Sequence, residues 1–160
     1  MIRPADSAAV DFLLPRHVDN TYGGRKTALW LLGLVLLMKS AIGLNSIFNG
    51  YTVARSADGV PLETFSPEAA RAVVSLFSLL GVSHVVFALI GILVLFRYRA
   101  LVPLVFSLLL LEHVGKRLVL YFQPVVEAPA RSATVVGWIF LVSMAAGLVL
   151  SLWQKRGSDL

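Results

Sequence analysis

Ionisable side chains lie in the middle of long apolar stretches of this sequence. They come from three stretches: Lys39 from the first, His84 from the second, and Glu112, His113, Lys116 and Arg117 from the third. Charged side chains are costly in a bilayer and usually face the interior of a helix bundle, so each is a candidate for function. A carboxylate and an imidazole can exchange protons, whereas ammonium and guanidinium groups can bind an anion.

Each of the three stretches places an ionisable residue at a similar depth. Every residue of a helix adds the same rise, and Lys39, His84 and Glu112 all fall near the middle of their stretches. Lys116 follows Glu112 by four residues, so the two share a helix face. We therefore predict a buried cluster in which Glu112 accepts hydrogen bonds from Lys39 and Lys116, with His84 adjacent.

The predicted cluster has more positive than negative charge. Lys39, Lys116 and Arg117 oppose one carboxylate, Glu112, which leaves a surplus of two positive charges when the histidines are neutral. An uncompensated buried charge is expensive, so the surplus indicates a missing anion. We expect an anionic or carbonyl-bearing amphiphile to bind here: a lipid headgroup, a fatty acid or a quinone. The predicted ligand-binding residues are Lys39, Asn45, His84, Glu112, His113, Lys116 and Arg117.

The same residues leave other functions open. Glu112 with His84 or His113 could be the acid–base pair of a membrane enzyme or a proton relay. The two histidines could instead be the axial ligands of a b-type haem that carries electrons. A purely structural role is a further alternative, in which Glu112 and Lys116 form an intrahelical pair. The sequence has no motif for a metal site, and it leaves both catalysis and the cofactor undecided.

Four apolar stretches must position these side chains. They cover about residues 27–48, 72–96, 101–122 and 134–153, and about 20 helical residues cross a bilayer core of about 30 Å. Of the 160 residues 58% are apolar and 14% are charged, against about 45–50% and 25% in soluble domains. We predict an all-α integral membrane four-helix bundle over residues 27–153. An interfacial segment, residues 1–26, precedes it, and a tail, residues 154–160, follows.

The positive charges outside the apolar stretches predict the orientation. Eight Lys and Arg residues lie on the side of the two termini and three lie on the other side, so both termini are expected in the cytoplasm. The basic residues form no solvated stripe, which argues against a nucleic-acid partner. Arginine outnumbers lysine ten to four, which suggests a GC-rich bacterial genome and hence an inner membrane. Membrane lipid is the expected partner, with a larger membrane complex as a further possibility.

Four features together resemble a known family. They are the order of the spans, the long first loop, the tight Arg97-Tyr98-Arg99 connection and the Gly115-Lys116-Arg117-Leu118 stretch. Over most of the chain, this outline is similar to that of small DoxX-like four-helix membrane proteins. The resemblance implies a four-helix membrane fold and carries over no catalytic residue.

Overall fold

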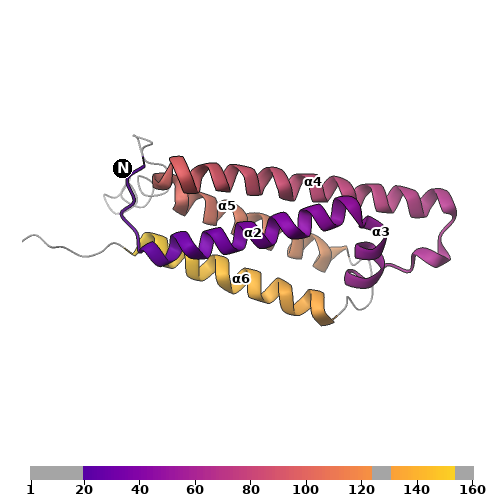
Figure 1. Ribbon diagram of the computed structural model, residues 1–160. Coiled ribbons are helices and arrows are strands. Elements are labelled where there is room, and N and C mark those ends of the chain that lie inside the picture. Colours follow the sequence, from indigo (N-terminus) through magenta and orange to yellow (C-terminus); the bar gives the residue numbers. More distant parts are fainter. Residues whose placement is uncertain (1–19, 124–130, 154–160) are drawn as a thin grey trace, which may run out of the picture.

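The computed structural model describes residues 20–123 and 131–153, and within these ranges the chain is helical and contains no strand. Four long helices lie side by side with alternating direction (Figure 1). They are α2 (Lys26–Phe48), α4 (Pro67–Arg97), α5 (Val102–Phe122) and α6 (Arg131–Leu152). The predicted all-helical class is thereby confirmed. Most of the predicted N-terminal segment, residues 1–19, and the predicted tail, residues 154–160, lie outside the described residues.

The segment between α2 and α4 is folded rather than extended. It contains a short helix α3 (Gly50–Thr52), a π-helical turn η1 (Val53–Ala57) and a 3₁₀ turn η2 (Leu62–Thr64). Gly59 has a φ of 70°, which glycine adopts without a steric penalty. Apolar side chains of this segment pack on the first turns of α4, and the residues involved are Ala54, Val60, Leu62, Val73, Val74 and Phe77.

Helix α4 begins where its capping residues place it. The Ser66 side chain accepts a hydrogen bond from the Ala69 backbone N–H at 3.3 Å, Pro67 is the first helical residue, and Glu68 lies in the first turn. These are favourable groups at a helix start. The helix therefore starts five residues before the apolar stretch predicted at 72–96. With 31 residues it is about 46 Å long, which exceeds the hydrocarbon core of a bilayer.

Within the described part of the chain, three helices are long and apolar enough to cross a membrane: α2, α4 and residues 133–152 of α6. Helix α5 has 21 residues but differs from these three in composition, because Glu112, Lys116 and Arg117 interrupt its apolar sequence. A short 3₁₀ turn η3 (Arg99–Leu101) joins it to α4.

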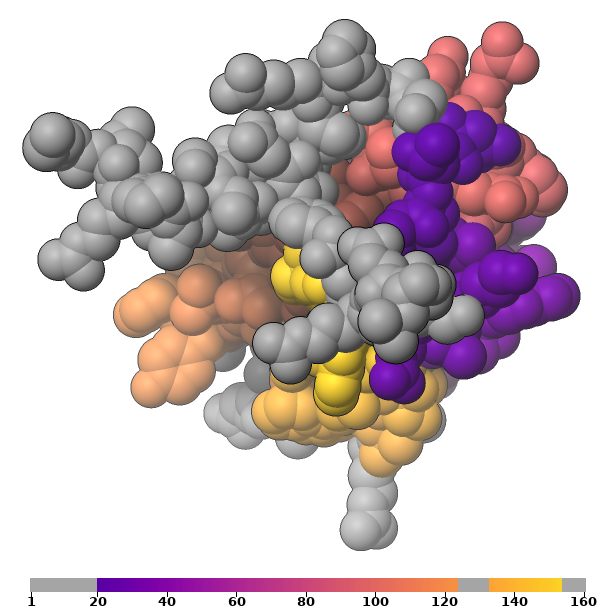
Figure 2. Space-filling model, turned by 90° about the vertical axis from the view of Figure 1, so that its left-hand side faces the viewer, coloured from indigo at the N-terminus to yellow at the C-terminus, as the bar shows by residue number. Residues whose placement is uncertain are grey.

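One half of the bundle has a continuous core. We call this the closed half; it contains the start of α2, the end of α4, the start of α5 and the end of α6 (Figure 1). Viewed from this end, the four helices occupy different sides of the molecule (Figure 2). Its largest fully buried side chain is Phe106 of α5, whose ring lies directly against Gly147 of α6. The core residues are Ala28, Leu32, Val35, Leu36, Val94, Val102, Val105, Phe106, Leu109, Phe140 and Met144.

In the other half, which we call the open half, the close packing is that of α2 against α4. Helices α2 and α4 remain in close contact there, because a Cβ atom on Gly81 would lie 2.6 Å from the Gly43 carbonyl oxygen. Helix α5 contributes no buried residue after Leu109 and α6 contributes none before Phe140, within the described side chains. Helix α6 diverges from α2 towards this end (Figure 1). The open half therefore lacks the four-sided core of the closed half.

Candidate functional site

The predicted polar cluster lies at the boundary between the two halves. Leu36 and Leu109 are the last buried apolar core residues of α2 and α5. Lys39 and Glu112 each follow three residues later, about one helical turn further on. Charged groups thus replace the apolar core at the level where the core shared by the four helices ends.

The Glu112 carboxylate holds two ammonium groups. The Nζ atom of Lys39 lies 2.5 Å from Oε2, and the Nζ atom of Lys116 lies 2.6 Å from Oε1. This geometry confirms the predicted contacts of Glu112 with both lysines. The two lysines differ in burial, because the side chain of Lys39 is 8% exposed and that of Lys116 is 40% exposed.

His84 completes the cluster from α4. The Lys116 ammonium lies 2.8 Å from Nε2 of His84, whereas Glu112 Oε1 lies 3.7 Å from the same atom. An ammonium has only protons to donate, so it donates to Nε2, which must then be the unprotonated nitrogen of a neutral ring. His84 is therefore a neutral acceptor, and its remaining N–H, on Nδ1, is buried without a well-formed hydrogen bond to the described residues.

A glycine crossing positions Lys39 beside His84. Gly43 lies one turn after Lys39 and Gly81 lies one turn before His84. A Cβ atom on Gly43 would lie 3.0 Å from the Cβ atom of His84. Small residues allow helices to approach closely in a membrane, so these two glycines bring the polar faces of α2 and α4 together.

The cluster retains a surplus of positive charge. The Lys39 and Lys116 ammonium groups share one carboxylate, and His84 is neutral, so one positive charge has no counter-charge within the cluster. The Phe87 ring offers partial compensation, with its centroid 6.0 Å from the Lys39 Nζ atom. Such a cation–π contact is worth about 0.5–2 kcal/mol. This contact involves the buried Lys39, so the uncompensated positive charge lies on the exposed Lys116.

Arg117 and His113 form a separate arrangement on the other side of α5. The Arg117 Nε–H donates to Nε2 of His113 at 3.3 Å, and the guanidinium carbon lies 4.4 Å from the centroid of the Trp138 ring. The His113 ring stacks on Phe140 of α6, with 6.4 Å between centroids. These two predicted ligand-binding residues therefore face α6, whereas Lys116 faces α4.

The structure does not bring Asn45 to the cluster. Asn45 is exposed on α2, and its side-chain oxygen accepts a hydrogen bond from Asn49 at 2.9 Å. The angle of about 120° between Asn45 and Lys39 around the helix explains the separation.

The histidines are not arranged as a haem-binding pair. Nε2 of His84 contacts Lys116, and Nε2 of His113 accepts from Arg117. The Nε2 atom of each histidine therefore contacts a cation, and the two contacts lie on opposite sides of α5. An iron between the two rings would have to displace both cations.

Three aromatic residues that contact the polar side chains are absent from the predicted ligand-binding residues. Phe87, Trp138 and Phe140 contact Lys39, Arg117 and His113, respectively. The sequence places Trp138 only at a membrane interface, and Phe87 and Phe140 look like any other apolar residue of a span. Spacing alone therefore offers no signal for these contacts.

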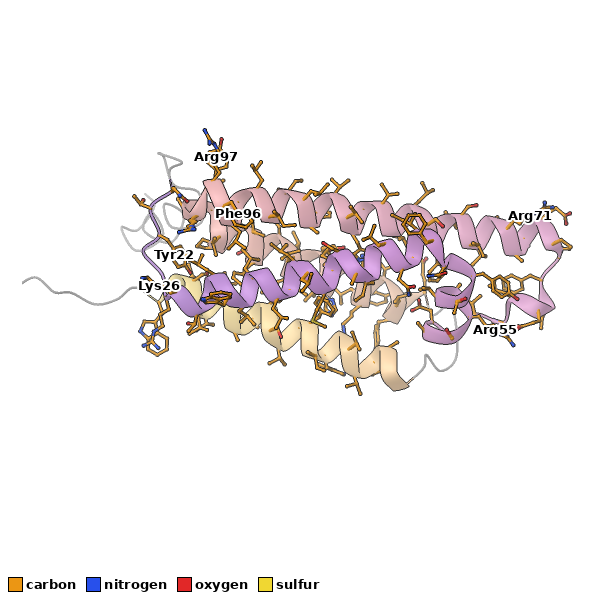
Figure 3. The ribbon with its side chains drawn as sticks, viewed as in Figure 1. Tyr22, Lys26, Arg55, Arg71, Phe96 and Arg97 are labelled. Carbon is orange, nitrogen blue, oxygen red and sulfur yellow. The ribbon has the colours of Figure 1, made fainter. Side chains whose placement is uncertain are left out.

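A hollow of about 590 Å³ lies at the far end of the closed half. It is lined by Asn20, Leu93, Phe96, Arg97 and Tyr98. Phe96 and Arg97 lie at the end of α4 that is remote from the loop containing Arg55 (Figure 3). Leu93 follows His84 by nine residues, or about 13 Å along the helix, so the hollow is not part of the polar cluster.

No family model matches this sequence, and no curated protein and no solved structure matches it either. The argument for function therefore depends on the site itself.

Proposed function

We propose that the chain is a bacterial inner-membrane protein of four spans with both termini in the cytoplasm, similar in outline to DoxX-like proteins. The charge distribution supports this orientation. Lys26 and Arg97 lie at the closed end of the bundle, with Arg25 and Arg99 beside them in sequence, and Arg55 and Arg71 lie at the opposite end (Figure 3). Basic residues favour the cytoplasmic side of a membrane, so the closed half faces inward and the open half outward.

The packing of α5 supports its role as the fourth span. Its 21 residues are about 31 Å long, enough to cross the hydrocarbon core. Its charged side chains contact groups on α2, α4 and α6, whereas Leu111 and Leu118 are more than half exposed. A lipid-facing helix buries its charges against neighbours and presents apolar residues to lipid.

The proposed function is the binding of an anionic or carbonyl-bearing amphiphile at Lys39, His84, Glu112 and Lys116. The observation that carries it is the sharing of Glu112 by two ammonium groups, one buried and one exposed. The buried pair of Lys39 and Glu112 is neutral by itself. Lys116 then holds the surplus charge, and a single anionic group placed against it would neutralise the cluster.

The open half suits the apolar part of such a ligand. Val119 and Leu120 are exposed on α5 beyond the level of Glu112, and both lie within about 60° of Lys116 around the helix. An alkyl chain can lie along these residues while its polar group reaches Lys116. Binding would then combine a charge-assisted contact with apolar burial.

Thermal unfolding of the purified protein in a neutral detergent tests this function. The probes are oleate, phosphatidylglycerol and decylubiquinone, with oleyl alcohol as the uncharged control. At least one probe should raise the unfolding temperature of the parent, by mass action, and raise that of Lys116→Met much less. Lys26→Met is the matched control, because Lys26 is exposed at the start of α2, and it should respond like the parent.

Equal responses of the parent and Lys116→Met to all three probes would show that Lys116 holds no ligand. The site would then be a structural ion-pair network. A response of the parent to oleyl alcohol equal to its response to oleate would show that chain burial alone drives the stabilisation.

A proton relay is a second candidate, favoured by one observation. Lys39, Glu112, Lys116 and His84 form an unbroken series of contacts that joins α2, α5 and α4. Ionisable chains of this kind mark proton pathways in membrane proteins. Purified protein in vesicles with a pH gradient should then dissipate the gradient, and His84→Phe should abolish the flux. A gradient that decays no faster than in empty vesicles would eliminate the relay.

A further inference from the structure

The Arg117 guanidinium is a membrane-embedded cation without a carboxylate partner among residues 20–123 and 131–153. A charged group at this depth requires compensation, and the Trp138 ring and a neutral histidine supply only part of it. We propose that Arg117 and Trp138 form a second binding site, distinct from the Lys116 site, which takes the phosphate group of an outer-leaflet phospholipid.

Two contacts hold the guanidinium in a fixed orientation. Nε is engaged by His113, and the planar group stacks over the Trp138 ring at 4.4 Å. Gly137 leaves the space that the guanidinium occupies, because a Cβ atom there would lie 2.6 Å from Nη2 of Arg117. The terminal nitrogens make no hydrogen bond to the described part of the chain. A guanidinium presented in this way can donate two parallel hydrogen bonds to phosphate oxygens.

The position along α5 places this site near the outer interface. Arg117 lies five residues before Phe122, the last residue of α5, or about 7.5 Å from the helix end. The Trp138 side of the site is open, because this residue is 53% exposed. A phospholipid seated against Trp138 can therefore bring its phosphate to Arg117 with its chains alongside α5 and α6.

The second site is independent of the first in geometry. Adjacent residues of a helix point about 100° apart, so Lys116 turns towards His84 of α4 and Arg117 towards Trp138 of α6. The inference rests on the proposed membrane placement of α5 and does not require an amphiphile at Lys116.

Native mass spectrometry of delipidated protein in detergent tests this inference. The probe is phosphatidylglycerol, with diacylglycerol of the same chains and inorganic phosphate as comparison ligands. Phosphatidylglycerol should bind Arg117→Met about tenfold more weakly than the parent, because the variant loses roughly one charge-assisted hydrogen bond. Arg117→Lys retains the charge without the planar fork and should lose at least threefold. Arg71→Met, which removes an exposed arginine near the same membrane face, should bind like the parent.

The outcomes separate this inference from the proposed function. Lys116→Met should retain its phosphatidylglycerol affinity at the second site even if it loses a ligand at the first. Equal affinity of the parent and Arg117→Met for phosphatidylglycerol would overturn the second site, as would equal binding of diacylglycerol or complete displacement by inorganic phosphate. If Arg117→Met does not fold, Arg117→Lys and Trp138→Leu decide the question, and unchanged affinity in both would also overturn it.

Discussion

The two halves of the bundle differ in packing, although the same four helices form both. In the closed half every helix contributes to one apolar core centred on Phe106, and the chain between α4 and α5 is a short turn. In the open half the close contact of α2 with α4 persists at Gly43 and Gly81, while α5 and α6 bury nothing in the described side chains. The polar cluster separates the two regions. The core that stabilises the fold thus lies in the closed half, and the proposed binding site lies at its boundary with the open half.

This division explains why buried charge can be tolerated. Lys39 and Glu112 sit directly on the closed core, which fixes both side chains in place, and Lys116 sits where the packing ends. Removing one partner of a buried ion pair is strongly unfavourable, so we expect Lys39 and Glu112 to stay paired. Lys116, whose side chain is 40% exposed, has room for the proposed ligand.

The largest effect is expected from matched phenylalanine substitutions on α5. Phe106 is 0% exposed and Phe122 is 76% exposed. Phe106→Ala should lower the free energy of unfolding by about 3–4 kcal/mol because it leaves a cavity in the closed half. Phe122→Ala should change it by less than about 0.5 kcal/mol. Unfolding titrations in mixed detergent micelles measure both, and similar losses would remove the distinction between the halves.

Removal of the shared carboxylate should have the next largest effect. Glu112→Gln leaves the Lys39 and Lys116 ammonium groups without a counter-charge, at a cost of about 1–3 kcal/mol, below the largest values for buried pairs because polar contacts in membranes average less. The double variant Glu112→Gln/Lys116→Met should recover part of this loss. A double variant that is less stable than Glu112→Gln would show that Lys116 is not the source of the surplus charge.

A matched pair of glycine substitutions sharpens the description of the open half. A Cβ atom on Gly81 would clash with the Gly43 carbonyl at 2.6 Å, whereas a Cβ atom on Gly115 meets nothing within 4 Å. Gly81→Ala should therefore cost about 1–2 kcal/mol by forcing α2 and α4 apart, and Gly115→Ala should be neutral or slightly stabilising. Thermal unfolding compares the two, and equal effects would mean that the glycine crossing does not hold α2 against α4.

The smallest effect at neutral pH concerns Tyr22, which precedes α2 and packs against the core of the closed half. Burial raises the pKa of Tyr22 from 10.0 to about 12, because its hydroxyl is buried without a hydrogen-bond partner in the described residues. The folded state therefore holds this proton more tightly than the unfolded state. The stability it contributes is complete below pH 10 and falls as the pH rises towards 12.

Alkaline titration at 295 nm measures this shift. The difference between the parent and Tyr22→Phe isolates one of the four tyrosines and should show a midpoint near pH 12. A midpoint near pH 10 would show that Tyr22 is not packed against the closed core.

Much of the architecture follows from local signals in the sequence. The apolar stretches predict the four long helices, and Ser66 with Pro67 predicts the start of α4 better than hydropathy does, because a cap acts through hydrogen bonds to the backbone. The contacts of Glu112 with Lys39 and Lys116 follow from depth and helical spacing. These features depend on residues that are close in sequence or at a common height along the helices.

The sequence does not predict that Lys116 and Arg117 face different neighbouring helices. Lys116 and Arg117 are adjacent in sequence, and which neighbouring helix each one faces depends on how α5 is rotated between α4 and α6. That rotation is set by contacts such as Phe106 against Gly147, which are distant in sequence. The pairing of Arg117 with Trp138 follows from this rotation, which a single sequence does not reveal.

The central claim is that Lys116, at the boundary of the open half, holds an anionic or carbonyl-bearing amphiphile. Mass spectrometry of amphiphiles that co-purify with the parent, Lys116→Met and Lys26→Met tests it most directly. The parent and Lys26→Met should carry the same amphiphile in near-stoichiometric amount, and Lys116→Met should lose most of it. Equal amounts on all three proteins, or no such molecule on the parent, would contradict the claim.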